Sequence, residues 1–169
     1  MIVAMQSFDP STFVFSLADE ASTQALGAAL APCLAGGLSV HLLGDLGAGK
    51  TTFTRGLLRA LGVRGALRSP SYALVEPYAL AQLGGASLHH FDFYRLEHTP
   101  LAWKEAGFAE AFEPPHAAIV EWPQYARGLP APALTVQLTH TLETRLAQCT
   151  VAQGAFTASI SAALQAFTP

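Results

Sequence analysis

Asparagine does not occur among the 169 residues of this chain. The guanine-reading motif N-K-x-D of ordinary GTPases therefore has no counterpart here, and that class is excluded. Charged residues are also scarce, at 12% of the chain, which is about half the share of an average soluble protein. With a net charge of −3, the chain lacks the overall basic field that a stand-alone nucleic-acid-binding protein uses. Such a chain either buries much of itself or presents apolar surface to partners.

Cysteine is nearly absent as well, since Cys33 and Cys149 are the only two and form no C-x-x-C pair. This excludes a disulfide framework, and we expect two reduced thiols in the core. The first residues, MIVAMQSFDPSTF, have no basic segment ahead of an apolar run, so we expect no signal peptide. The uncharged stretches 21–44 and 146–169 contain turn-forming or polar residues and do not resemble membrane-spanning helices. We expect a soluble, cytoplasmic protein.

One glycine-rich stretch, GDLGAGKTT, follows the apolar segment 38–43 and precedes a helical pattern at 50–61. It matches G-x-x-x-x-G-K-[ST], the phosphate-binding loop of P-loop proteins, in the strand–loop–helix context that the motif requires. Glycines let successive backbone N–H groups point inward, and the helix adds its positive N-terminal end. Lys50 would reach the β- and γ-phosphates of a nucleotide, and the Thr51 hydroxyl would bind Mg²⁺. The predicted nucleotide-binding residues are Gly44, Asp45, Leu46, Gly47, Ala48, Gly49, Lys50, Thr51 and Thr52.

Apolar residues follow strand and helix periodicities in turn along the chain. Strands are expected at 12–17, 38–43, 75–78, 87–94, 117–122, 133–140 and 145–152. Helices are expected from Asp19 to about Gly36, at 50–61, in one or two short pieces within 101–112, and in the tail from Phe156 to Phe167. This alternation predicts an α/β fold: a P-loop NTPase-like mixed, mainly parallel sheet flanked by helices, with antiparallel strands at the C-terminal end. The length suits a single domain over residues 1–169.

Hydrolysis of a nucleotide would also need a carboxylate near the metal, at the end of an apolar strand. Glu121, after Ala-Ala-Ile-Val, is the better match, and Asp92, after His-His-Phe, is the second. Either one, taken singly, is also compatible with an ordinary surface acid. His89 and His90 are neighbours on a predicted strand, so their side chains point to opposite faces and do not easily chelate one ion. We expect both to be structural or surface histidines.

The arginines do not form the dense cluster that a small-molecule kinase places as a lid over the transferred phosphate. Between Asp45 and Glu76, however, all charged residues are basic. This basic run consists of Lys50, Arg55, Arg59, Arg64 and Arg68. It is either a solvated helix face or a patch that meets an acidic partner or an RNA phosphate within a complex.

Four motifs occur in the order GDLGAGKTTFTRG, SPSY with LVEPY, HFDFYRL, and VEWP. Together they resemble the TsaE family, the ATPases of bacterial tRNA threonylcarbamoyladenosine (t6A) biosynthesis. The resemblance implies a P-loop α/β fold that binds ATP with Mg²⁺ and hydrolyses it slowly. It also implies a two-protein threonylcarbamoyl transferase complex as partner, which hydrolysis resets for further turnovers, with tRNA contacted only through that complex. The alternative is a small-molecule P-loop kinase.

The resemblance assigns roles to residues at matching positions. Lys50, Asp92, Glu121 and Ser71 would be catalytic. Thr51 and Glu121 would hold Mg²⁺ directly or through water, and Asp92 would orient the attacking water or the metal's hydration shell. Which acid plays which part stays open. Ser71 stands where the family usually has threonine and keeps the hydroxyl that would sense the γ-phosphate.

Three further residues are assigned less directly. Glu20 and Arg145 match positions of the family on the nucleotide side. Trp122, directly after Glu121, is either near the nucleotide or partner, or packed in the core. The segment 94–120 keeps only a loose family pattern, and the tail beyond residue 152 has no motif that indicates its role.

Overall fold

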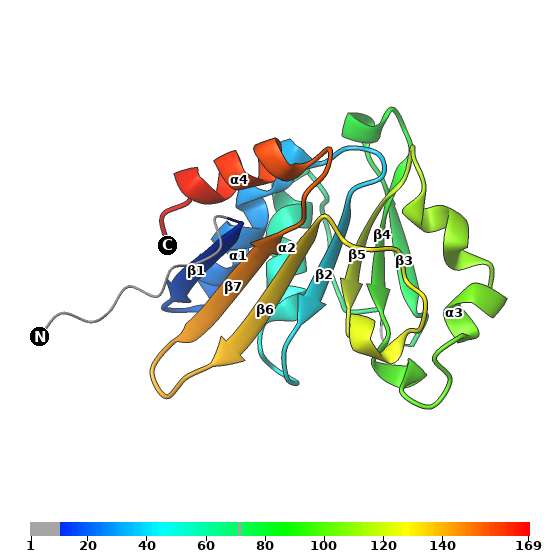
Figure 1. Ribbon diagram of the computed structural model, residues 1–169, viewed down its shortest axis with the longest axis horizontal. Coiled ribbons are helices and arrows are strands. Elements are labelled where there is room, and N and C mark those ends of the chain that lie inside the picture. Colours follow the sequence, from blue (N-terminus) through cyan, green and yellow to red (C-terminus); the bar gives the residue numbers. More distant parts are fainter. Residues whose placement is uncertain (1–10, 71) are drawn as a thin grey trace, which may run out of the picture.

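A single seven-stranded sheet, in the order β1-β7-β6-β2-β5-β4-β3, forms the centre of the protein (Figure 1). The structure, a computed structural model, describes residues 11–70 and 72–169. The expectation of no signal peptide rests largely on residues 1–10, and the prediction of a hydroxyl that senses the γ-phosphate rests on Ser71. These residues lie outside the described part of the chain.

The elements alternate as follows. The strands are β1 (Thr12–Leu17), β2 (Ser39–Leu43), β3 (Val75–Ala79), β4 (Ser87–Asp92), β5 (Ala117–Glu121), β6 (Leu134–His140) and β7 (Arg145–Val151). The α-helices are α1 (Glu20–Ala29), α2 (Lys50–Ala60), α3 (Ala102–Glu105) and α4 (Thr157–Ala166). Short 3₁₀ turns are Ala31–Cys33, Ala81–Leu83, Tyr94–Leu96, Phe108–Phe112 and Pro123–Tyr125.

Parallel pairing at the centre of the sheet confirms the predicted fold class. β2 pairs in parallel with β5 and β6, and β5 pairs in parallel with β4. The expected C-terminal hairpin is β6–β7, and β1 adds to β7 in antiparallel fashion. An antiparallel β3–β4 pair at the other edge was not expected. Since only β3 and β7 run against the rest, the sheet is mixed and mainly parallel.

The two strands that carry the predicted carboxylates end earlier than the sequence predicts. β5 stops at Glu121 because Trp122 has a left-handed backbone with φ of 59°. β4 stops at Asp92 because a 3₁₀ turn begins at Tyr94. Both carboxylates therefore belong to the last residue of their strand. They lie side by side at the C-terminal ends of the parallel strands, where the chain leaves the sheet.

Apolar side chains fill both sides of the central strands. Ile119 packs on one side with residues of α1, α2 and α4. Val120, the next residue, packs on the other side with Phe91 and Trp103. In the view of Figure 1, α1 and α2 lie behind β1, β7 and β6, whereas α3 lies beside β3 and β4.

Other expectations from the sequence can be checked directly. Cys33 and Cys149 are free and buried. Asp19 caps α1, since its carboxylate accepts from the Ser22 N–H at 2.8 Å and its own N–H donates to Ser22 Oγ at 3.1 Å. Within residues 11–70 and 72–169, none of the helices has the length and apolar character that a membrane span requires.

Two glycines bring α1 and α2 into backbone contact. A Cβ added at Gly27 would lie 2.0 Å from the carbonyl oxygen of Phe53, and one added at Gly56 would lie 1.9 Å from that of Gln24. Side chains at these positions would force the helices apart. Because α2 begins at Lys50, this contact fixes the helix that carries the lysine of the phosphate-loop motif.

Gly56→Ala tests this contact. Alanine in a helix interior is usually more stable than glycine by about 1 kcal/mol. Here we expect the opposite sign, a loss of roughly 1–3 kcal/mol from overpacking, measured as the free energy of unfolding in urea. A stabilised variant would show that the helices have room to separate.

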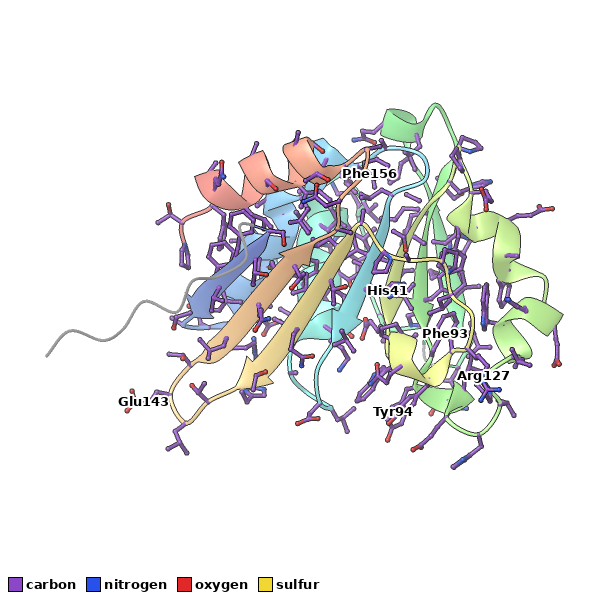
Figure 2. All side chains as sticks on the ribbon, viewed as in Figure 1. His41, Phe93, Tyr94, Arg127, Glu143 and Phe156 are labelled. Atoms are coloured by element: carbon purple, nitrogen blue, oxygen red, sulfur yellow. The ribbon has the colours of Figure 1, made fainter. Side chains whose placement is uncertain are left out.

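His41 is a buried polar residue on β2, in the middle of the sheet (Figure 2). Burial lowers its pKa to about 4. Below its ordinary pKa of about 6.5, the unfolded chain takes up a proton that the folded chain does not. His41 therefore makes the protein less stable as the pH falls through this range.

His41→Leu should remove part of this acid sensitivity. Between pH 6.5 and pH 4, the wild type should lose up to about 3 kcal/mol more of its unfolding free energy than the variant. Urea unfolding at several pH values measures the difference, with His98→Gln as an exposed control. Parallel stability curves for wild type and His41→Leu would contradict the prediction.

Candidate nucleotide site

The phosphate-binding motif forms the connection between β2 and α2. Gly44 and Gly49 have φ values of 139° and 109°, which side chains disfavour. A Cβ at Gly44 would also lie 2.4 Å from the carbonyl oxygen of Leu138. His140, at the end of the same strand, contacts the Gly47 carbonyl oxygen through Nε2 at 2.8 Å. The loop is thus curved by its glycines and supported from the β6 side.

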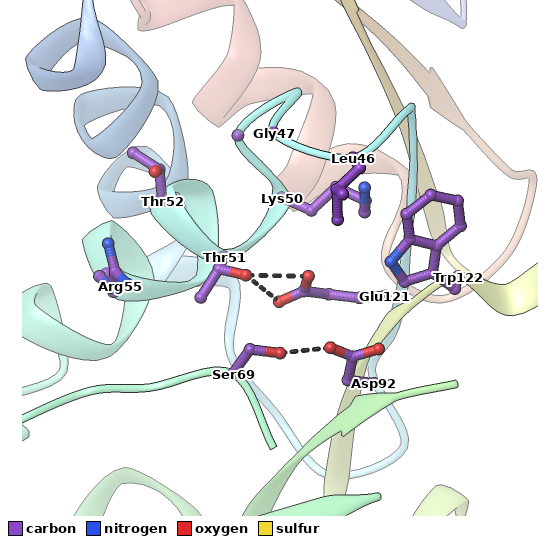
Figure 3. Close-up of a pocket in the computed structure, with 11 residues that line it drawn as sticks. Leu46, Gly47, Lys50, Thr51, Thr52, Arg55, Ser69, Asp92, Glu121 and Trp122 are labelled. Carbon is purple, nitrogen blue, oxygen red and sulfur yellow. Dashed lines mark hydrogen bonds between the residues drawn. The ribbon is translucent and has the colours of Figure 1, made fainter. Parts of the chain in front are cut away.

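A pocket opens where this loop faces the ends of β4 and β5 (Figure 3). Its lining comes from four separate stretches of the chain and contains most of the residues predicted from the sequence. These lining residues are Leu46, Gly47, Gly49, Lys50, Thr51, Thr52, Arg55, Ser69, Asp92, Glu121 and Trp122. Gly44, Asp45 and Ala48 belong to the loop but are not part of the lining.

Lys50 is buried at the base of the pocket. Its Nζ donates to the carbonyl oxygens of Gly44 at 2.7 Å and Asp45 at 2.8 Å, and it lies 3.9 Å from the centre of the Trp122 ring. Burial lowers the pKa of Lys50, and the negative charge of Glu121 is the largest influence that opposes this shift. Trp122, 8% exposed, is therefore both packed and in contact with the lysine of the site.

The two predicted carboxylates lie side by side. Asp92 and Glu121 are direct partners in the parallel β4–β5 register, and they are 4% and 2% exposed. Both oxygens of Glu121 are within hydrogen-bond distance of the Thr51 hydroxyl, at 2.9 and 3.0 Å. Asp92 instead accepts from Ser69 Oγ and, at 3.0 Å, from the Tyr94 N–H. Glu121 thus faces the phosphate loop, and Asp92 faces the segment that leads to Ser71.

These groups fit Mg²⁺. Thr51 and Glu121 offer a hydroxyl and a carboxylate, the hard oxygen ligands that this ion prefers. Among the described residues, there is no group of three or more His, Cys, Asp or Glu side chains that could hold a metal ion. A Mg²⁺ ion here would complete its shell with water and phosphate oxygens, as is usual for nucleotide sites.

His90 is part of this cluster, whereas its sequence context predicted only a structural or surface histidine. Its Nε2 lies 2.8 Å from Glu121 Oε1, and the side chain is 2% exposed. His89 points the other way and packs against Phe91. The sequence does contain a sign of this position. His90 and Asp92 are two residues apart on one strand, so their side chains lie on the same face of the sheet.

Glu20 and Arg145 do not line the pocket. Glu20 is exposed and lies 3.7 Å from the guanidinium of Arg55. Arg145 donates to Thr23 Oγ1 at 2.8 Å, and its guanidinium lies close behind Gly49. Contact of either residue with a nucleotide stays a prediction.

Two arginines of the basic run donate hydrogen bonds to backbone oxygens of this protein. The sequence predicted either a solvated helix face or a patch for a partner, and neither includes this role. Arg55 donates to the Leu67 carbonyl oxygen at 3.0 Å. Arg59 donates to the carbonyl oxygens of Val63 at 3.1 Å and Gly65 at 2.5 Å. Both therefore hold the connection after α2. Arg64 and Arg68 are exposed members of the run.

Comparison with known proteins gives the family. The family model described as threonylcarbamoyl adenosine biosynthesis protein TsaE matches residues 17–147. A tRNA threonylcarbamoyladenosine biosynthesis protein TsaE from Nostoc sp. is 34% identical over 142 residues, which cover 83% of this chain and 85% of that protein. The protein of the same name from Haemophilus influenzae is 41% identical over 92 residues, a match that spans only 54% of this chain and 56% of that protein.

Solved structures agree with this result. The crystal structure of YdiB from Bacillus subtilis matches with a TM-score of 0.72 and 25% sequence identity, over 91% of this chain and 94% of that chain. The likeness supports the P-loop-like α/β fold read from the sheet order. The family match contains the phosphate loop and both strand-end carboxylates. The chain belongs to the TsaE family.

Proposed function

We propose that this protein binds ATP with Mg²⁺ in the pocket of Figure 3 and hydrolyses it slowly, as an accessory subunit in tRNA threonylcarbamoyladenosine biosynthesis. The contact between Thr51 of the phosphate loop and the buried carboxylate of Glu121 carries the proposal. P-loop ATPases hold Mg²⁺ with such a pair. The pathway is inferred from the names of the TsaE relatives.

Each residue of the site would have a defined role. Bound Mg²⁺ would neutralise charge on the β- and γ-phosphates. Thr51 and Glu121 would hold the ion directly or through water. Lys50 and the N–H groups of the loop would stabilise the charge that develops when water attacks the γ-phosphate in line. Asp92 would orient that water or the hydration shell, and Ser71 would sense the γ-phosphate.

Hydrolysis by the protein alone should be weak. Among the described residues, Arg55 is the one arginine that lines the pocket, and its guanidinium group already contacts the Leu67 carbonyl oxygen and Glu20. It is thus poorly placed to act as an arginine finger, which in related chemistry accelerates hydrolysis by roughly 10³–10⁵. We infer that a partner completes the site.

The partner would be the two-protein complex that transfers the threonylcarbamoyl group to tRNA, and hydrolysis would reset this complex for further turnovers. Contact with tRNA would be indirect, through that complex. A cytoplasmic location remains a prediction.

The fate of the γ-phosphate separates this proposal from a small-molecule kinase. With γ-labelled ATP and Mg²⁺, we expect the label in free phosphate, at a rate well below the roughly 1–100 s⁻¹ of kinases. Glu121→Gln should reduce the rate by at least about 100-fold, because it removes a charge that acts on the metal. Label in an added acceptor, or fast turnover without a partner, would favour the kinase.

Multiple-turnover tRNA modification tests the resetting role. In a reaction with the transferase complex, Lys50→Ala should retain one round of modification and lose the later rounds, because nucleotide binding is lost. Lys104→Ala is the matched control, since Lys104 is the other lysine and lies on the surface. If Glu121→Gln binds ATP and still supports many rounds, the protein is a nucleotide-gated adaptor, and hydrolysis is not needed.

A further inference from the structure

His90 has a position that packing alone does not explain. Its side chain is almost completely buried on β4, and its ring makes one polar contact, the 2.8 Å contact with Glu121 Oε1. Among the described residues, Nδ1 of the ring has no hydrogen-bond partner. A buried nitrogen without a partner lowers stability. An apolar side chain would therefore suit a purely structural position better.

The contact with His90 makes the surroundings of the two Glu121 carboxylate oxygens different. Thr51 Oγ1 lies within 3.0 Å of both, but its hydroxyl has a single hydrogen to donate. Oε1 has His90 Nε2 as a second neighbour, and since a carboxylate only accepts, Nε2 carries the hydrogen. Oε2 keeps the larger unused capacity to accept. The carboxylate is thus fixed between β4 on one side and α2 on the other.

We propose that His90 is a positioning residue for Mg²⁺: its Nε2–H holds Glu121 Oε1, so that Oε2 faces the metal or a water bound to it. The inference rests on the proposed function, because it assigns His90 to the Mg²⁺–ATP site. Groups that orient the ligands of a metal contribute strongly to metal affinity, and their loss typically weakens it by about 10–100-fold.

The chain offers a matched set of variants. Glutamine at position 90 can donate from its amide to Glu121, whereas methionine has similar length, fills space flexibly and cannot donate. His89→Met is the control, because His89 lies on the same strand with its ring against Phe91 and His116, on the other face of the sheet. A purely structural role would make His90→Met and His90→Gln equal in Mg²⁺ dependence.

The experiment measures binding of a fluorescent, non-hydrolysable ATP analogue to the full chain during a Mg²⁺ titration, and again in EDTA. For His90→Met, the Mg²⁺ concentration at half-maximal binding should rise by about 10-fold or more, with binding in EDTA within about twofold of wild type. His90→Gln should recover most of the effect, and His89→Met should match wild type. Thermal unfolding checks that all variants are folded.

Two outcomes would overturn the inference. If wild-type binding depends on Mg²⁺ but His90→Met and His90→Gln behave alike, the inference fails and the proposed function stands. If the wild-type protein binds the analogue equally well with and without Mg²⁺, the proposed function itself fails, and the role of His90 fails with it.

Discussion

Two buried carboxylates held in register at the ends of β4 and β5 constrain the rest of the structure. Asp92 and Glu121 are direct neighbours with little access to water, and like charges so placed destabilise one another unless donors and cations surround them. Lys50 at the start of α2 places a positive charge near the pair. Hydrogen-bond donors come from four segments: Thr51 of α2, Ser69, His90 of β4, and the backbone N–H of Tyr94 after β4.

Close backbone contacts and strand pairing hold the scaffold around the pair. Parallel pairing of β2 with β5 brings the start of the phosphate loop beside Glu121, and the glycine contact between α1 and α2 fixes the helix that begins at Lys50. Trp122 turns the chain immediately after the carboxylate and covers the lysine. Under the proposed function, what the fold would contribute to phosphate chemistry is the position of these groups, rather than the reactivity of any single one.

Much of the fold and of the candidate site could be predicted, because the sequence patterns that indicate them lie within short stretches of the chain. The strand–loop–helix pattern around Gly44–Thr51 predicts a loop that does line the pocket, and an acid after an apolar run predicts Glu121 beside it. Two features were missed for different reasons. The contact of His90 with Glu121 needs the pairing of β4 with β5, which lies far along the chain. The antiparallel β3–β4 pair joins consecutive strands, but residues 80–86 between them form a longer connection than the short turns that indicate a hairpin.

Arg55 and Arg59 of α2 influence which residues the connection after this helix can contain. Arg55 and Arg59 bind the connection 63–67 through its backbone oxygens, not through its side chains. Every amino acid supplies the same carbonyl group, so the exposed positions Arg64 and Ala66 can change without loss of these anchors, whereas Gly65 has a φ of 92° and Leu67 is buried. Substitution at these two positions can therefore leave the path of the segment unchanged, because both arginines still reach its backbone oxygens.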